Sequence, residues 1–209
     1  MNDFFDYFQI VVLIFFLLIF MGRTLYLRFA RGVKPITLGV GKQGLQRLVE
    51  LSFFVGLVLW IVEIVLHATH AKVRIFPALF YVQLIDSPPD SLSAKFVGMA
   101  VIILGFIIFI WALASFGDSW RVGIDLQSPG ELVTTGMFAL SRNPIFVFID
   151  LYFVGAFLIN GTPIFLVFAV LVLGGLHYQI LQEEKFLTNT YGDSYQRYFT
   201  RTGRYLLGF

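Results

Sequence analysis

Polar side chains suited to binding a charged ligand occupy two stretches in the second half of this 209-residue chain. The first is Ser141-Arg142-Asn143-Pro144, where we expect Asn143 to cap a helix whose first residue is Pro144. The N-terminus of such a helix, next to an arginine, suits a carboxylate or a phosphate. Asp150 follows seven residues after Asn143, so both side chains are predicted to share one helix face.

The second stretch lies near the end of the last apolar segment and contains His177, Gln179, Gln182, Glu183 and Glu184. His177 and Glu184 are also seven residues apart, which places them on a common helix face. Two adjacent glutamates suit a cationic group such as an ammonium or a sulfonium. Combined with the anion-binding stretch, they predict a site for a small zwitterionic ligand.

The composition identifies the environment of these residues. Hydrophobic residues make up 58% of the chain and charged residues 13%, and the mean hydropathy is +0.82. A soluble globule of this size could not bury so much apolar surface, so we expect an integral membrane protein. The absence of cysteine excludes disulfides and thiolate metal sites, and a net charge of +2 gives no reason to expect a nucleic-acid partner.

A transmembrane helix needs about 20 apolar residues. The sequence predicts an all-α protein with five spans and one membrane domain over residues 1–209, in which 1–95 precede a core of 96–209. Acidic Asp3 and Asp6 favour a retained first helix over a signal peptide. The proline-interrupted segment Ile75–Ile85 is too short for a sixth span, and the turn at 160–163 makes its two flanking helices antiparallel neighbours. The expected spans are Phe4–Met21, Leu48–Leu66, Phe96–Phe116, Pro144–Asn160 and Ile164–Gln182.

Basic residues set the expected orientation. Twelve of the fifteen lysines and arginines follow the first, third or fifth span, and three lie on the opposite side. Cytoplasmic loops are rich in lysine and arginine. We therefore expect the N-terminus outside, the C-terminus in the cytoplasm, and the chemistry on the cytoplasmic face of a bacterial inner membrane or an endoplasmic reticulum membrane.

Two further patterns are interpreted without a function. The GxGxxG match at residues 39–44 lies in a basic loop rather than in a βαβ unit, so we attribute it to chance. His67 and His70 have no carboxylate or third histidine near them in sequence, so an interfacial pair is favoured and no metal site is predicted.

Four short motifs resemble the isoprenylcysteine carboxyl methyltransferase-like family, a group of integral membrane methyltransferases that also includes phospholipid methyltransferases. The resemblance covers roughly Phe96–Phe209. Its motifs are Gly117-Asp118-Ser119-Trp120-Arg121-Val122-Gly123, Glu131-Leu132-Val133-Thr134-Thr135-Gly136-Met137-Phe138, Arg142-Asn143-Pro144-Ile145-Phe146, and Glu183-Glu184 followed by Tyr191-Gly192-Asp193-Ser194-Tyr195-Gln196-Arg197-Tyr198.

The resemblance implies S-adenosylmethionine as the cofactor, held by the last two helices, the loop before them and the C-terminal segment. It implies adenine contacts with the backbone of Leu132, Val133 and Gly136, and a lid made by Tyr195 and Tyr198. The amino-acid end of the cofactor would lie near Arg142, Asn143 and Glu184, and the remaining cofactor residues it implies are Pro144, Phe146 and Glu183. Asn143 and Phe146 replace a histidine and a tyrosine of many relatives, which disfavours a prenylcysteine substrate.

The sequence thus predicts an enzyme that methylates a lipid or another lipophilic acceptor, with a carboxylate, an amine or a thiol as the accepting group. An amine or thiol must lose a proton, and Asp150, His177 and Glu184 are the available bases. Arg121 is the candidate for holding an anionic acceptor. The alternatives are a transporter component with a proton path through Asp150, His177 and Glu63, and a non-catalytic assembly factor.

Overall fold

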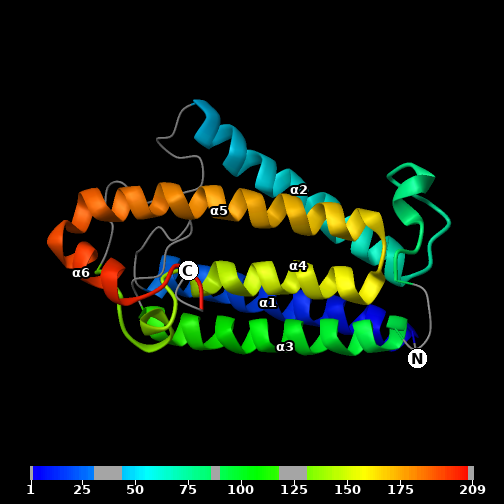
Figure 1. Cartoon of the computed structure of the whole chain (residues 1–209), viewed down its shortest axis with the longest axis horizontal. Coiled ribbons are helices and arrows are strands. Elements are labelled where there is room, and N and C mark those ends of the chain that lie inside the picture. Colours follow the sequence, from blue (N-terminus) through cyan, green and yellow to red (C-terminus); the bar gives the residue numbers. More distant parts are fainter. Residues whose placement is uncertain (1, 31–43, 86–89, 118–130, 207–209) are drawn as a thin grey trace.

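The protein is all-α, as its sequence predicts, in a computed structural model that describes residues 2–30, 44–85, 90–117 and 131–206. The main helices are α1 (Asn2–Ala30), α2 (Gly44–Ala68), α3 (Asp90–Phe116), α4 (Pro144–Asn160), α5 (Pro163–Tyr191) and α6 (Asp193–Arg201). Four of them, α1, α2, α3 and α5, are long and apolar enough to cross a membrane, and α4 is a shorter apolar helix. Figure 1 shows α1, α3, α4 and α5 side by side, with α2 lying aslant.

These five apolar helices coincide with the five predicted spans, but four of them are longer than expected, α1 and α5 by the most. Helix α1 continues to Ala30 rather than ending at Met21, and α5 continues to Tyr191 rather than ending at Gln182. Hydropathy marks only the apolar part of a helix, whereas the helical backbone continues until a residue such as Gly192 ends it. Glu183 and Glu184 therefore project from a continuous helix.

Helices α4 and α5 form the predicted antiparallel hairpin. Pro144 and Pro163 are the first residues of the two helices, where the missing N–H of proline has no intrahelical partner to lose. Gly161 ends α4 with a φ of 65°, and its N–H donates to the Phe157 carbonyl at 2.7 Å. The short 3-10 helix η1 (Ala78–Tyr81) replaces a sixth span, and Leu84 N–H just after it donates to the Gly161 carbonyl at 2.7 Å.

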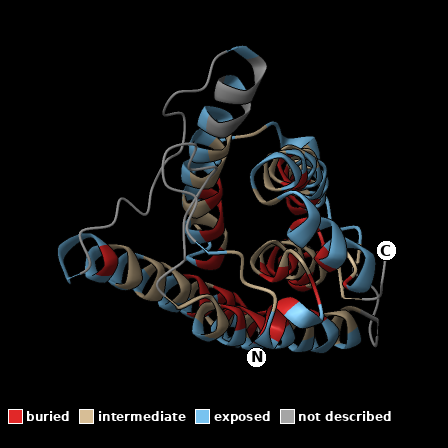
Figure 2. Cartoon of the chain, turned by 90° about the vertical axis from the view of Figure 1, so that its left-hand side faces the viewer, coloured by how far each residue is buried: buried red, intermediate tan, exposed pale blue. Residues whose placement is uncertain are grey.

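Helix α4 is the buried centre of the bundle, which explains how so short a helix can serve as one of the spans. It packs so closely on α3 that a Cβ atom on Gly155 would lie 2.5 Å from Ile102 Cγ1 and 2.6 Å from the Gly98 carbonyl oxygen. Figure 2 shows the buried residues facing inward from the neighbouring helices. Because protein surrounds α4, its ends do not have to reach the membrane surfaces on their own.

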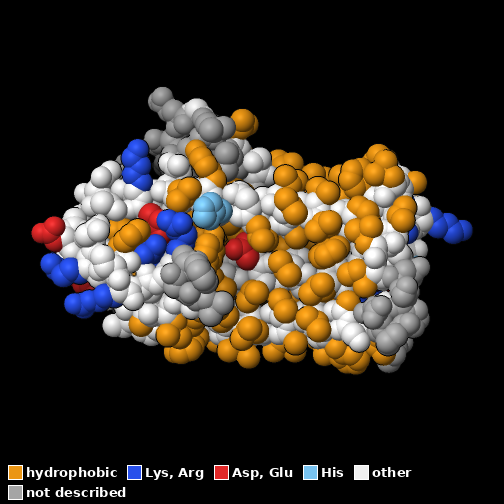
Figure 3. All heavy atoms as spheres, in the orientation of Figure 1, with side chains coloured by type: hydrophobic (Ala, Val, Ile, Leu, Met, Phe, Trp, Pro, Cys, Tyr) orange, Lys and Arg blue, Asp and Glu red, His pale blue; other side chains and the backbone are white. Residues whose placement is uncertain are grey.

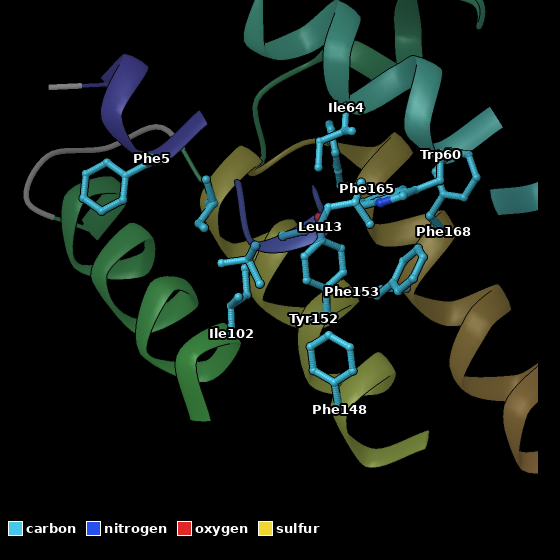
Figure 4. Packing of buried hydrophobic residues seen from close by; sticks show 14 of the residues in the cluster. Phe5, Leu13, Trp60, Ile64, Ile102, Phe148, Tyr152, Phe153, Phe165 and Phe168 are labelled. Atoms are coloured by element: carbon cyan, nitrogen blue, oxygen red, sulfur yellow. The ribbon is translucent and has the colours of Figure 1, made fainter. Parts of the chain in front are cut away.

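Aromatic side chains fill the contact between α2, α4 and α5. The fully buried Trp60 ring lies 4.4 Å from the Phe153 ring and 5.1 Å from the ring of Phe165 (Figure 4). Such edge-to-face and tilted pairs add to the dispersion energy of burial. This cluster holds α2 to the bundle at the half of α2 that is nearer η1.

Polar side chains inside the bundle bond to one another. The amides of Gln9 and Asn160 exchange hydrogen bonds of 3.0 and 2.9 Å, and the Tyr152 hydroxyl donates to the Gln9 carbonyl at 3.1 Å. These bonds fix α1 against α4 where water is absent. Figure 3 shows charged side chains gathered mainly at the α6 end of the molecule, with an apolar belt over the remaining length.

Candidate functional site

The segment before α4 is bonded to the C-terminal strap, by which we mean Thr202–Leu206. Asn143 is the N-cap residue and Pro144 the first residue of α4, as predicted, but the Asn143 side chain makes no capping bond. Asn143 Nδ2 instead donates to the Arg204 carbonyl at 3.2 Å, and the same oxygen accepts from Ser141 Oγ at 3.2 Å. The returning strap offers an acceptor that the local sequence does not reveal.

Arg142 joins α4, α5 and α6. Its Nη2 donates to Glu184 Oε1 at 2.7 Å, and its Nη1 donates to the Phe199 and Thr202 carbonyls at 2.7 and 2.8 Å. The guanidinium carbon also lies 3.9 Å from the centre of the Phe199 ring, and the side chain is only 6% exposed. A buried guanidinium with these partners ties three helices together.

The Glu184 carboxylate binds a second arginine, Arg204. Arg204 Nη2 donates to Oε2 at 2.7 Å, and Arg204 Nε lies 3.1 and 3.2 Å from the two carboxylate oxygens. These hydrogen bonds raise the pKa of Arg204 above its ordinary value. Two guanidinium groups therefore share one carboxylate whose side chain is 9% exposed.

The predicted lid residues on α6 differ from each other. The Tyr198 hydroxyl donates to the Phe138 carbonyl at 2.7 Å, which ties α6 to the 3-10 helix η3 (Gly136–Ala139). Tyr195 is fully buried, and its hydroxyl has no hydrogen-bond partner among the described residues. Burial raises the pKa of Tyr195 to about 12, and the negative charge of nearby Glu184 raises it too. Tyr195 thus presents an unused, neutral hydroxyl beside the arginine–glutamate cluster.

Asp150 and His177 both lie near the strap. His177 Nδ1 is 2.9 Å from the Tyr205 hydroxyl, with the two rings stacked, and the charge of Asp150 acts on the same hydroxyl. Asp150 Oδ1 is buried and has no hydrogen-bond partner within the described part of the chain. The predicted meeting of the polar faces of α4 and α5 is therefore direct at Arg142 and Glu184, whereas Asp150 and His177 each interact with Tyr205 of the strap.

The remaining predicted cofactor residues all lie in the described part of the chain, unlike Arg121, which is predicted to hold an acceptor. Leu132 and Val133 are half-buried, and Gly136 has a φ of 61° and packs against Ser115 of α3. Pro144 is buried, Phe146 is half-buried, and Glu183 Oε1 accepts from Gln179 Nε2 at 3.1 Å. Arg121 lies outside the described residues. The assignment of these residues to a cofactor stays a prediction.

The two histidines at the other end of the bundle have different neighbours. His67 packs on the Phe165 ring, with centres 5.1 Å apart, and His70 Nε2 lies 3.2 Å from Asp3 Oδ1. Asp3, Asp6 and His70 bring their ligand-type atoms within 4.8 Å of one another, so two carboxylates that are distant in sequence lie near His70 in space. The absence of a metal site stays a prediction.

Sequence reasoning missed Arg204, Phe199, Tyr205 and Thr202, which hold the cluster together. The signal available for them was weak. Gly192, with its positive φ of 50°, marks a break after α5, and the polar residues after it alternate with Tyr195 and Tyr198 at helical spacing. That pattern predicts an amphipathic helix returning to the bundle, but it does not identify the partner of each arginine.

Comparison with protein families gives one match. Residues 93–194 match the model of the phospholipid methyltransferase family, a range that includes η3, α4, α5 and nearly all of α3. No curated protein matches the chain. The family includes the isoprenylcysteine carboxyl methyltransferase-like membrane enzymes, so the resemblance is confirmed. Over this region, about half of its length, the chain belongs to the phospholipid methyltransferase family, and it is a membrane methyltransferase with several apolar helices.

Proposed function

We propose that the protein transfers a methyl group from S-adenosylmethionine to a lipid or lipophilic acceptor, at the junction where the start of α4 meets α5 and α6. We call this place the polar junction; it consists of Arg142, Glu184, Tyr195 and Arg204. The cofactor supplies a methyl group that is already activated by a sulfonium. Membership of the family supports this chemistry, and the lining of the polar junction supports the location.

The observation that carries the proposal is the unused hydroxyl of Tyr195. A fully buried hydroxyl without a partner costs free energy unless something hydrogen-bonds to it. Arg142 Nε and Gln179 Oε1 are also buried and have no hydrogen-bond partner among the residues that the structure describes. These donors and acceptors fit the carboxylate, ammonium and purine groups of the proposed cofactor.

Each residue of the proposed site has a separate task. The backbone of Leu132, Val133 and Gly136 would contact the adenine, and Glu184 would attract the ammonium of the amino-acid end. Tyr195 would hydrogen-bond to the same ligand from α6. Pro144 and Phe146 would line the site and exclude water from it. Exclusion of water strengthens each charge interaction in the site.

The acceptor would approach from the apolar side of the polar junction. In-line methyl transfer requires alignment of the acceptor atom with the activated methyl, which the protein supplies by holding both reactants. A carboxylate acceptor needs no base, whereas an amine or a thiol must release a proton. Asp150, with its unpartnered Oδ1, is the best placed proton acceptor, and the exposed His177 can pass a proton to water.

The orientation and the location of the site belong to the same proposal. The excess of lysine and arginine on one side supports a cytoplasmic C-terminus and an external N-terminus. The polar junction then lies at the cytoplasmic surface, where a water-soluble cofactor can reach it. Arg121 would hold an anionic headgroup at the same surface.

Calorimetric binding of S-adenosylhomocysteine to the detergent-purified protein tests the site. Wild type is expected to bind, and Tyr195→Phe is expected to bind about tenfold more weakly because one buried hydrogen bond to the ligand is lost. The matched control is Tyr7→Phe, at an exposed tyrosine of α1, which should bind like wild type. Equal binding by wild type and Tyr195→Phe would remove Tyr195 from the site, and no binding by folded wild type would refute the cofactor.

A further inference from the structure

The C-terminal strap covers the groups that the proposed cofactor needs. The Gly203 carbonyl accepts from Arg142 N–H at 2.9 Å, and the Arg204 carbonyl accepts from Asn143 Nδ2 and Ser141 Oγ, each at 3.2 Å. The strap continues into an apolar cluster, where Tyr205 and Leu206 pack with Val147 and Phe138. The strap thus crosses the start of α4 and is bonded along its length.

Glu184 is fully engaged in this arrangement. It accepts from Arg142 on one oxygen and from Arg204 on both. Two positive charges on one carboxylate leave a local excess of positive charge, which repels an ammonium. A ligand that presents an ammonium to Glu184 must therefore displace one of the two guanidinium groups.

Arg204 is the guanidinium that can leave. Arg142 holds two backbone carbonyls and stacks on Phe199 in addition to its bond to Glu184, and its side chain is 6% exposed. Arg204 is 25% exposed, and Glu184 accepts all the side-chain hydrogen bonds that the structure shows for it. Release of Arg204 thus breaks side-chain contacts with Glu184 alone and frees a charge that solvent already reaches, whereas release of Arg142 would also strip the Phe199 carbonyl of its donor.

We propose that the Arg204–Glu184 pair is the latch of the strap, and that binding of the ligand's ammonium at Glu184 releases Arg204 and opens the strap. The inference rests on the proposed function and adds regulation to its site. Arg204 lies beyond the matched family region, which ends at residue 194, so the evidence for the latch is the set of contacts within this chain. In the open state Arg142 keeps its bonds to the Phe199 carbonyl and to Glu184 and its contact with the Phe199 ring.

The absence of cysteine allows a direct test of strap opening. Ser141 is fully buried beneath the Arg204 carbonyl, so Ser141→Cys places a thiol that a maleimide reaches only when the strap lifts. Ser194→Cys, at an exposed position of α6, is the matched control. Adding Arg204→Gln should speed labelling of Cys at 141 about tenfold and leave the control rate unchanged.

Ligand affinity provides the second measurement. Arg204→Gln should bind S-adenosylhomocysteine several-fold more tightly than wild type, because only Arg142 then remains bonded to Glu184, and Arg204→Lys should fall between the two. Unchanged labelling at position 141, or weaker binding by Arg204→Gln, would overturn the latch. If folded wild type bound no S-adenosylhomocysteine, the proposed function would fail, while the labelling rates would still decide whether Arg204 holds the strap.

Discussion

The Arg142 guanidinium donates to the Glu184 carboxylate at 2.7 Å, across 42 residues of sequence. The sequence assigns both residues to the amino-acid end of one cofactor, with opposite charges for its carboxylate and its ammonium. In the structure these two side chains bind each other. Their ion pair is part of the polar junction, and the atoms that remain to bind a ligand are the buried ones without a hydrogen-bond partner in the described part of the chain.

Arg142 is therefore expected to stabilise the protein as well as the site. Arg142→Gln leaves Glu184 with one cation and frees the Phe199 and Thr202 carbonyls. Loss of one partner of a buried pair costs about 3–5 kcal/mol. Thermal unfolding in detergent measures the loss. Arg201→Gln, at an exposed arginine of α6, is the control and should change stability by less than about 0.5 kcal/mol. Equal stability of both variants would contradict the structural role of Arg142.

The two tyrosines of α6 give a matched pair. Tyr198→Phe removes the bond to the Phe138 carbonyl and should cost about 1–2 kcal/mol of stability. Tyr195→Phe removes a buried hydroxyl that makes no hydrogen bond to described residues, so stability should not fall below that of wild type. Chemical unfolding of both variants in the same detergent measures the difference. The assignment fails if Tyr195→Phe is the less stable of the two.

Stability should fall at high pH partly through Tyr195. Burial raises the pKa of its phenol from the ordinary 10.0 to about 12. Below about pH 10 the proton is bound in both folded and unfolded states, so the contribution is complete there. Between pH 10 and about 12 the unfolded chain loses the proton first, and stability declines. Unfolding measured from pH 9 to 12 should show a shallower decline in Tyr195→Phe, and an identical slope would place the hydroxyl in water.

The contact between α3 and α4 depends on Gly155. Gly155→Val should destabilise the protein by about 1–3 kcal/mol or more, because any Cβ at this position would clash with Ile102 and the Gly98 carbonyl oxygen. The control is Gly22→Ala in α1, where a Cβ meets nothing within 4 Å and stability should rise slightly. Thermal unfolding again separates the two, and a tolerated valine would contradict the close packing of α3 and α4.

The orientation in the membrane is testable with single cysteines. Ser194→Cys on α6 should resist an impermeant maleimide in intact cells and react after the membrane is opened. Lys72→Cys, in the segment after α2, should react in intact cells. The reverse pattern would invert the topology and place the polar junction on the outer surface.

The sequence predicts the elements well because membrane helices depend on hydropathy and length, both of which are local properties. It identifies the hairpin at Gly161, since proline and glycine fix the backbone there. It places Asn143 correctly at the start of α4 but misses the partner of its side chain, which is the Arg204 carbonyl, 61 residues later. Local patterns predict where a polar side chain is, but its partner depends on how distant segments pack.

The site shows the same division. Arg142, Glu184 and Tyr195 are predicted from their types, their positions near helix ends and the family resemblance, and the structure brings them together. Arg204 counts only as one more basic residue in sequence, although it makes the bidentate contact with Glu184. His70 likewise has no carboxylate near it in sequence, yet Asp3 lies 3.2 Å from it.

Methyl transfer in proteoliposomes tests the central claim most directly. The purified protein, reconstituted with phospholipid, is incubated with S-adenosylmethionine carrying a labelled methyl group, and the lipid extract is counted. Wild type should place label in the lipid fraction. Tyr195→Phe, which is expected to stay folded, should place less at a limiting cofactor concentration, and Tyr7→Phe should match wild type. Binding of S-adenosylhomocysteine without label in any lipid fraction would contradict methyl transfer to lipid and would favour a non-catalytic role.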